Sequence, residues 1–169
     1  MMISLILSLS GILIPYWTIM KYDAFNIKGH AGLNFGCKFD SSNVSRNLVQ
    51  FCDKWYKQSY GWEIASKSLI DLAVLLEILT IIYAIVTITM LKSKKIALYI
   101  LPALATLTLV VLAVGIGIYA GKHNDRQDAT EANVTVYLAI SFWLAASAII
   151  TNLIAALIGG FIIVTIPEY

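Results

Sequence analysis

Four long apolar runs dominate this sequence, and none of them contains more than two charged residues. A helix needs roughly 20 apolar residues to cross the hydrocarbon core of a bilayer, and backbone polar groups in lipid are satisfied only within helices or closed barrels. The alternating pattern of about ten residues that is typical of membrane barrels is absent. The runs therefore predict four membrane-spanning helices, at residues 3–20, 68–91, 96–120 and 134–166.

The content of charged residues supports a membrane protein. Only 13% of the 169 residues are charged and 59% are hydrophobic, which is too few charges to cover a soluble globular protein. Short connections between the runs predict an up-down four-helix bundle that forms a single domain over residues 1–169. The net charge of +2 comes from scattered basic residues and does not indicate nucleic-acid binding.

The short loop at 92–95 orients the predicted bundle. It contains three lysines, and the positive-inside rule places such a loop in the cytoplasm. Both termini are then also expected in the cytoplasm, and the loops at 21–67 and 121–133 are expected outside. The first outer loop carries more basic residues, but long loops cross the membrane largely regardless of charge. We expect a multi-pass protein of the plasma membrane.

The two cysteines, Cys37 and Cys52, both lie in the first predicted extracellular loop. This loop matures in an oxidising compartment and offers the cysteines no neighbouring histidine partners, so a disulfide is expected in preference to a metal site. The bridge would close about 16 residues and stabilise the loop by about 3 kcal/mol in the chain-entropy model. Two free thiols are the alternative interpretation.

Two N-glycosylation sequons are present, at residues 43–45 between the cysteines and at 133–135 where the fourth apolar run begins. A glycan is expected at Asn43, which lies in the predicted outer loop. None is expected at Asn133, because the membrane surface would keep the glycosylating enzyme away.

The first outer loop also contains segments that suit strands. Residues 22–27 alternate loosely, 33–39 combine aromatic residues with glycine, and 48–60 are rich in aromatic residues. These segments predict a small antiparallel sheet, and the disulfide would stabilise it where its own core is thin.

Several residues around this loop occur in an informative order. Trp17 closes a Pro-Tyr-Trp sequence after the first run, Gly32 and Leu33 follow, Cys37 comes five residues after the glycine, and Cys52 lies further on. This order resembles the first extracellular loop of the claudin superfamily, which includes claudins, peripheral myelin protein, epithelial membrane proteins and calcium-channel gamma subunits. The family pattern is a tryptophan, then Gly-Leu-Trp, two residues, a cysteine and a second cysteine.

The resemblance extends to Lys67 in the Ala-Ser-Lys-Ser-Leu sequence at 65–69, which is similar to the small-small-Arg-small-Leu run of the family's second helix. Asn34 stands where the family has its second tryptophan. The resemblance implies a left-handed four-helix bundle capped by a small antiparallel sheet, with Trp17 and the Gly-Leu segment at 32–33 holding the sheet near the membrane. A position in an aromatic belt is the alternative for Trp17, because tryptophan favours the membrane interface.

Small residues at helical spacing mark two faces on which the predicted helices would meet. Small side chains let membrane helices approach closely, so contacts within the bundle are expected first and a dimer interface is the alternative. The two stripes are Ser4, Ser8 and Gly11 in the first run, and Ala148, Asn152, Ala155 and Gly159 in the fourth.

Two carboxyl groups lie in the second run, where an ionisable side chain is costly and suggests function. Asp71 lies near the predicted outer end, where it could pair with Lys67. Glu77 lies deeper, among leucines and isoleucine. It is expected either as a protonated carboxyl that is hydrogen-bonded to a neighbour, with Asn152 the candidate, or as a contact for a cation or a partner subunit. Glu77 and Asn152 form the candidate intramembrane polar site.

No residue pattern points to catalysis. The sequence has no phosphate-binding loop, nucleophile elbow or zinc motif, and its two histidines lie in different loops. We expect no enzyme activity, no cofactor and no metal site.

The function is therefore expected to lie in binding. The claudin resemblance implies protein–protein contacts in cell adhesion or cell-junction organisation, with junction components and the lipid bilayer as partners. The alternative is an auxiliary, gamma-like subunit that modulates an ion channel or receptor. The ending at residues 166–169 does not match the motifs that PDZ domains bind, which disfavours a scaffolded barrier protein. Self-association into a homo-oligomer is a further option, and no nucleic-acid partner is expected.

Overall fold

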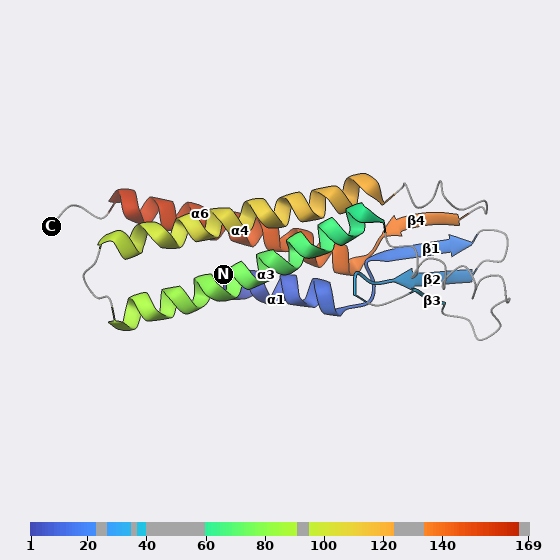
Figure 1. Cartoon of the computed structure of the whole chain (residues 1–169), viewed down its shortest axis with the longest axis horizontal. Helices are drawn as coiled ribbons and strands as arrows, with labels where there is room; N and C mark the ends of the chain where they lie inside the picture. The colour runs from blue at the N-terminus through green and yellow to red at the C-terminus, as the bar shows by residue number, and fades with distance from the viewer. Residues whose placement is uncertain (23–26, 35–36, 40–59, 91–94, 124–133, 166–169) are drawn as a thin grey trace.

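Helices lie side by side in the computed structural model, and a small sheet lies beyond one end of them (Figure 1). The structure describes residues 1–22, 27–34, 37–39, 60–90, 95–123 and 134–165. The helices are α1 (Met2–Leu13), α3 (Gly61–Met90), α4 (Lys95–Lys122) and α6 (Ile140–Thr165). The strands are β1 (Thr18–Tyr22), β2 (Ile27–Ala31), β3 (Cys37–Phe39) and β4 (Val134–Leu138).

The expected architecture of four helices with a small antiparallel sheet is confirmed, and three of the helices are long and apolar enough to cross a membrane. These are α3, α4 and α6, whereas α1 is a shorter apolar helix. At a rise of about 1.5 Å per residue, the 12 residues of α1 cover only about 18 Å. That is well short of the roughly 30 Å of a bilayer core.

The prediction of a first span at 3–20 is therefore wrong at its outer end. The helix ends at Leu13, and Ile14 adopts an extended conformation with φ −82° and ψ 128°. The cause is Pro15, since a proline disfavours the helical conformation in the residue before it. The apolar residues that follow enter β1 instead.

The predicted fourth span at 134–166 is likewise two elements. Its first residues, Val-Thr-Val-Tyr-Leu, form β4, and α6 begins at Ile140. This sequence is rich in β-branched and aromatic residues, which favour strands. Hydropathy alone did not distinguish the strand from the helix that follows it.

The second and third predicted spans match α3 and α4, with α3 beginning about two turns earlier than expected. Its start is capped locally, because the Tyr60 backbone N–H donates to Glu63 Oε2 at 3.2 Å. A carboxylate in this position satisfies an N–H group that the helix itself leaves unpaired.

The sheet is antiparallel, with the strand order β3-β2-β1-β4. The prediction of one strand at 22–27 is wrong, because Tyr22 ends β1 and Ile27 begins β2, opposite it. Of the described residues in the predicted strand at 33–39, residues 37–39 pair in the sheet, whereas 33 and 34 do not. The predicted strand at 48–60 lies outside the described residues except for Tyr60, which directly precedes α3.

Close approaches at glycine join the helices. A Cβ atom on Gly11 of α1 would lie 2.9 Å from Ala145 Cβ on α6, and one on Gly115 of α4 would lie 3.0 Å from the Ile70 side chain on α3. Real Cβ atoms essentially never come as close as 2.9 Å, so the observed packing requires glycine at position 11. A Cβ at Gly115 would be tightly packed and would make its neighbours shift by a few tenths of an ångström. The expected contact between small-residue faces within the bundle is confirmed for α1 and α6.

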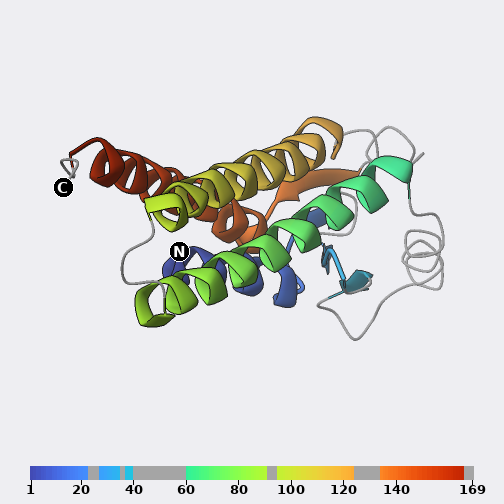
Figure 2. The same cartoon turned by 60° about the vertical axis from the view of Figure 1, so that its left-hand side comes forward.

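The two ends of the bundle differ. The end of α3, the start of α4 and the end of α6 lie at the end opposite the sheet, and α1 begins partway along the bundle (Figure 1). A second direction shows the sheet again at the end away from the C-terminus (Figure 2). We call the two halves the sheet half and the loop half.

Candidate functional site

A buried polar cluster lies near the middle of the bundle, centred on Glu77 of α3. Ser4 Oγ donates to Glu77 Oε1 at 2.5 Å, and Asn152 Nδ2 donates to the same oxygen at 2.7 Å. Ser8 Oγ lies further away, at 3.4 Å. All four side chains are fully buried. The hydrogen bond predicted between Glu77 and Asn152 is thus present, and the cluster joins α1, α3 and α6.

The hydrogen bonds of this cluster are distributed unevenly over its acceptor oxygens. Every donor converges on Glu77 Oε1, whereas Glu77 Oε2 and Asn152 Oδ1 are buried and have no partner. An ionised carboxylate would leave one charged oxygen unsatisfied in an apolar interior, which is costly. A neutral acid carries no charge on that oxygen, so its burial costs less. The count therefore favours the neutral acid.

Burial bears on the other interpretation of Glu77. Its side chain is 0% exposed, so a partner subunit has no access to it in this conformation. Within the described ranges, no group of three or more histidine, cysteine, aspartate or glutamate side chains is placed to hold a metal ion. The surroundings of Glu77 are the serine hydroxyls and the Asn152 amide.

The serines are the part of this cluster that sequence reasoning missed. Ser4 and Ser8 were predicted only as small residues at a helix contact, whereas the hydroxyl of Ser4 binds the carboxyl group directly. Ser4 Oγ also lies 3.2 Å from the Ala148 carbonyl oxygen. Two serines four residues apart on one helix face, opposite a carboxyl in another apolar run, were the available signal.

A second cluster lies where the helices meet the sheet, around Trp17. Its ring is 0% exposed and makes edge contacts with Tyr119 at 4.9 Å and Phe142 at 6.0 Å between centroids. Its Nε1–H donates to the Gly11 carbonyl at 2.5 Å. A belt residue would face lipid, so burial excludes the aromatic-belt alternative for Trp17.

The backbone of Trp17 continues this connection into the sheet. Its N–H donates to Ala31 O at 2.9 Å, and its carbonyl accepts from the Ala139 N–H at 2.9 Å. Leu33, from the Gly-Leu pair at 32–33, packs against the same apolar cluster. Trp17 therefore attaches the sheet to the bundle through both its ring and its backbone.

The other predicted site residues are more dispersed. Cys37 begins β3 and packs beside Met20, Ala31 and Val136, while Cys52 and Asn43 lie outside the described residues. Lys67 is partly buried near the start of α3. No ion pair joins Lys67 and Asp71 among the described side chains, although their spacing along α3 allows one.

One face of the sheet is open. Ile19 of β1 lies opposite Tyr137 of β4, and their side chains are 36% and 54% exposed. Cross-strand partners share a face, so His30, which also lies opposite Ile19, and the exposed Lys38 opposite His30 belong to this face. His30 itself is buried and stacks on Tyr16, at 4.3 Å between centroids.

The opposite face is closed. Met20, Ala31 and Val136, which alternate with the residues of the open face, are 0%, 3% and 6% exposed. The sheet thus has one structural face and one accessible face, a distinction that the sequence did not reveal because no strand alternates cleanly.

Comparisons with known proteins add nothing to these contacts. No protein-family model matches this chain, and no curated protein matches it. The two clusters and the open face of the sheet are therefore the features on which a function is argued.

Proposed function

We propose that this chain is a claudin-like, multi-pass protein of the plasma membrane that acts through protein–protein contacts in cell adhesion or cell-junction organisation. The observation that carries the proposal is the open face of a sheet that is fixed to the end of an apolar bundle. Trp17, the Gly-Leu pair at 32–33 and Cys37 support it through their resemblance to the claudin superfamily.

The open face has a composition suited to binding protein. Tyr137 and Ile19 supply exposed apolar area, and tyrosine is enriched at interfaces. Lys28 and Lys38 are exposed on the same face. Such a face favours a partner surface that combines an apolar patch with acidic side chains, because opposite charges guide association.

In the proposed orientation the sheet lies outside the cell and the connection at 91–94 lies inside. Lysines at 92, 94 and 95 support it, as does the position of the end of α3 and the start of α4 at the end of the bundle opposite the sheet. A glycosidase shift on a gel tests the orientation. We expect a shift in the wild type that disappears in Asn43→Gln and persists in Asn133→Gln. A protein without any shift, or one that keeps it in Asn43→Gln, would contradict this expectation.

A disulfide between Cys37 and Cys52 belongs to the same proposal. Cys37 is held at the closed face of the sheet, and the described part of the chain contains no free cysteine. We expect the wild-type protein to migrate faster on a non-reducing gel than after reduction, and Cys52→Ser to abolish the difference. A free thiol at Cys37 in labelling experiments would refute the bridge.

Partner capture tests the adhesion role. The protein is purified from native membranes in mild detergent, as wild type, as Tyr137→Glu and as Leu157→Ala, which changes an exposed residue of α6. We expect junction proteins with the wild type and with Leu157→Ala, localisation of both at cell contacts, and loss of both properties in Tyr137→Glu. Retention of partners by Tyr137→Glu would contradict a role for the open face.

A second candidate, the auxiliary subunit, is favoured by the outer surface of α6. The apolar stretch of α6 is 17% buried, against 28% for α3 and for α4, and it exposes Ile150, Leu157 and Phe161. A helix of a channel or receptor could pack there. In the same capture experiment, a channel or receptor at fixed stoichiometry, lost in Leu157→Ala and kept in Tyr137→Glu, would establish this candidate and overturn the adhesion role.

A further inference from the structure

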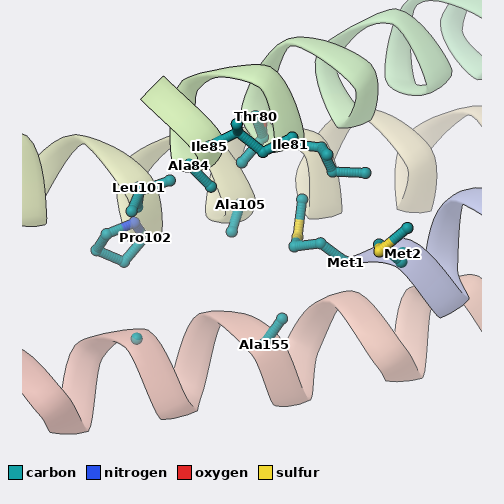
Figure 3. A pocket seen from close by; sticks show the side chains of 11 residues that line it. Met1, Met2, Thr80, Ile81, Ala84, Ile85, Leu101, Pro102, Ala105 and Ala155 are labelled. Atoms are coloured by element: carbon teal, nitrogen blue, oxygen red, sulfur yellow. The ribbon is translucent and has the colours of Figure 1, made fainter. Parts of the chain in front are cut away.

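An apolar cavity of about 400 Å³ opens in the loop half of the bundle (Figure 3). It lies beyond the start of α1, at the level where only α3, α4 and α6 continue. The lining residues are Met1, Met2, Thr80, Ile81, Ala84, Ile85, Leu101, Pro102, Ala105, Ala155 and Gly159.

The wall offers hydrocarbon contacts and no polar recognition. The hydroxyl of Thr80 donates to its own helix, at the Leu76 carbonyl, at 2.6 Å. Met1 and Met2 contribute flexible, polarisable side chains, which adapt to a ligand of irregular shape. Small side chains at Ala105 and Ala155 provide the space. A ligand for this cavity must therefore be apolar where it is bound.

The size of the cavity discriminates between apolar ligands. A helix about 10–12 Å across occupies roughly 420–610 Å³ per turn, so a cavity of about 400 Å³ holds less than one turn. A methylene group has a volume similar to that of a liquid water molecule, ~30 Å³, and the cavity holds on the order of a dozen methylenes. One hydrocarbon chain fits where a helix does not.

We propose that this cavity binds one acyl chain of a membrane lipid. The inference rests on membrane insertion of α3, α4 and α6, and it is independent of the adhesion role. An empty cavity deprives its lining atoms of dispersion contacts, and the bilayer supplies acyl chains at this depth at high concentration. The bound chain supplies packing contacts to α3, α4 and α6 in the loop half of the bundle.

Photolabelling in a bilayer tests the proposal. The probe is a phosphatidylcholine with a diazirine near the middle of one acyl chain, mixed into unlabelled phosphatidylcholine, and labelled residues are located by mass spectrometry. We expect label concentrated on Ala84, Ala105 and Ala155, above the level on Leu107 and Leu157, which are exposed on the bundle surface at 49% and 64%. Equal labelling of the cavity and of this surface would reduce the site to ordinary lipid contact and overturn the proposal.

Two adjacent glycines provide a matched pair of variants. A Cβ on Gly159 points toward Pro102, at 3.4 Å from Pro102 Cβ, whereas a Cβ on Gly160 meets nothing within 4 Å. We expect the leucine side chain in Gly159→Leu to fill the cavity and lower its labelling, roughly fourfold for each methylene of the lipid chain that it displaces. Gly160→Leu should leave the labelling of the cavity unchanged. Gly159→Ala, which needs only ordinary contact, gives a milder form of the same test if the leucine variant does not fold.

The remaining outcomes identify other occupants. With a photo-reactive amino acid in place of Ala105 or Ala155, crosslinks between two chains that are lost in Gly159→Leu would show that a second copy fills the cavity and would overturn the acyl-chain proposal. Unchanged labelling of the cavity in both Gly159→Leu and Gly159→Ala would also overturn the acyl-chain proposal. Absence of label from α3, α4 and α6 altogether would refute membrane insertion itself, whereas failure of the open-face variants to lose junction partners would leave the cavity result untouched.

Discussion

In the sheet half of the bundle, α1 packs against α6 and α3, whereas the corresponding space in the loop half is the apolar cavity. The sheet half contains fully buried side chains such as Trp17, Ile70 and Leu112. The Glu77 cluster lies between the two halves, at the first turn of α1. The comparison shows that, among the described residues, α1 packs against its neighbouring helices in the sheet half and borders the cavity only with Met1 and Met2.

The two halves also differ in the structural elements that are attached to them. The sheet half carries the sheet, and Trp17 connects both through ring contacts and backbone hydrogen bonds. Among the described residues, the loop half carries the end of α3, the start of α4 and the end of α6. Substitutions in the sheet half should therefore be the more destabilising, and the following variants test that ranking.

The largest effect is expected for Trp17→Ala. Removal of a fully buried ring leaves a cavity between Tyr119 and Phe142, and such substitutions cost about 3–5 kcal/mol in the free energy of unfolding. Unfolding in detergent micelles measures the loss. The matched control is Trp143→Ala, at a ring that is 59% exposed on α6, for which we expect less than about 1 kcal/mol. Equal losses in both variants would contradict the assignment of Trp17 as the connecting residue.

A smaller loss is expected for Gly11→Ala. The added methyl group would lie 2.9 Å from Ala145 Cβ and 3.0 Å from the Ser141 carbonyl oxygen, so α1 must shift away from α6. Overpacking of this kind costs typically about 1–3 kcal/mol. Gly117→Ala on α4, where a Cβ meets nothing within 4 Å, serves as the control in the same unfolding experiment. A neutral Gly11→Ala would show that the α1–α6 contact is loose.

Loss of the amide at Asn152 should cost less again. Asn152→Leu removes the donor at 2.7 Å from Glu77 Oε1 but leaves Ser4 in place. Hydrogen bonds between membrane helices average about 0.6 kcal/mol and reach about 1.7 kcal/mol, and we expect a loss within that range. Thr151→Val, which deletes only a local bond to the Ala148 carbonyl, is the control. A Thr151 variant as unstable as the Asn152 variant would argue against an inter-helix role for the amide.

The smallest effect is expected in the loop half. Gly159→Ala places a methyl group at ordinary contact distance, 3.4 Å, from Pro102 Cβ at the cavity. We expect a change within about 0.5 kcal/mol, because the cavity accommodates the added volume. Comparison with Gly11→Ala then measures the same substitution in both halves. Equal destabilisation by Gly11→Ala and Gly159→Ala would contradict the inferred difference in packing between the two halves.

Much of the architecture follows from the sequence because apolar length is a strong signal for membrane helices. It predicted four helices, and the few polar groups in the apolar runs were informative because each needs a partner. That reasoning correctly connected Glu77 with Asn152. The resemblance to a known family identified Trp17, whose burial no pattern in the sequence could establish.

The errors have local causes. Hydropathy does not register that Pro15 stops α1, nor that the β-branched residues at 134–138 form a strand ahead of α6. The cavity was missed for a different reason, because it depends on how α3, α4 and α6 pack around Met1 and Met2, which hydropathy does not contain. The roles of the Ser4 hydroxyl and of the open face of the sheet depend on packing and register, which single-residue patterns do not contain.

We infer that a neutral polar cluster joins the two halves, and the protonation state of Glu77 is its most direct test. The measurement is the infrared difference spectrum between the wild type and Glu77→Gln, with the protein in bilayers at neutral pH. We predict a C=O stretching band of a protonated carboxylic acid in the wild type that is missing from the variant, with a difference of less than about 1 kcal/mol in the free energy of unfolding. A carboxylate band at Glu77, with no carboxylic-acid band, would contradict it.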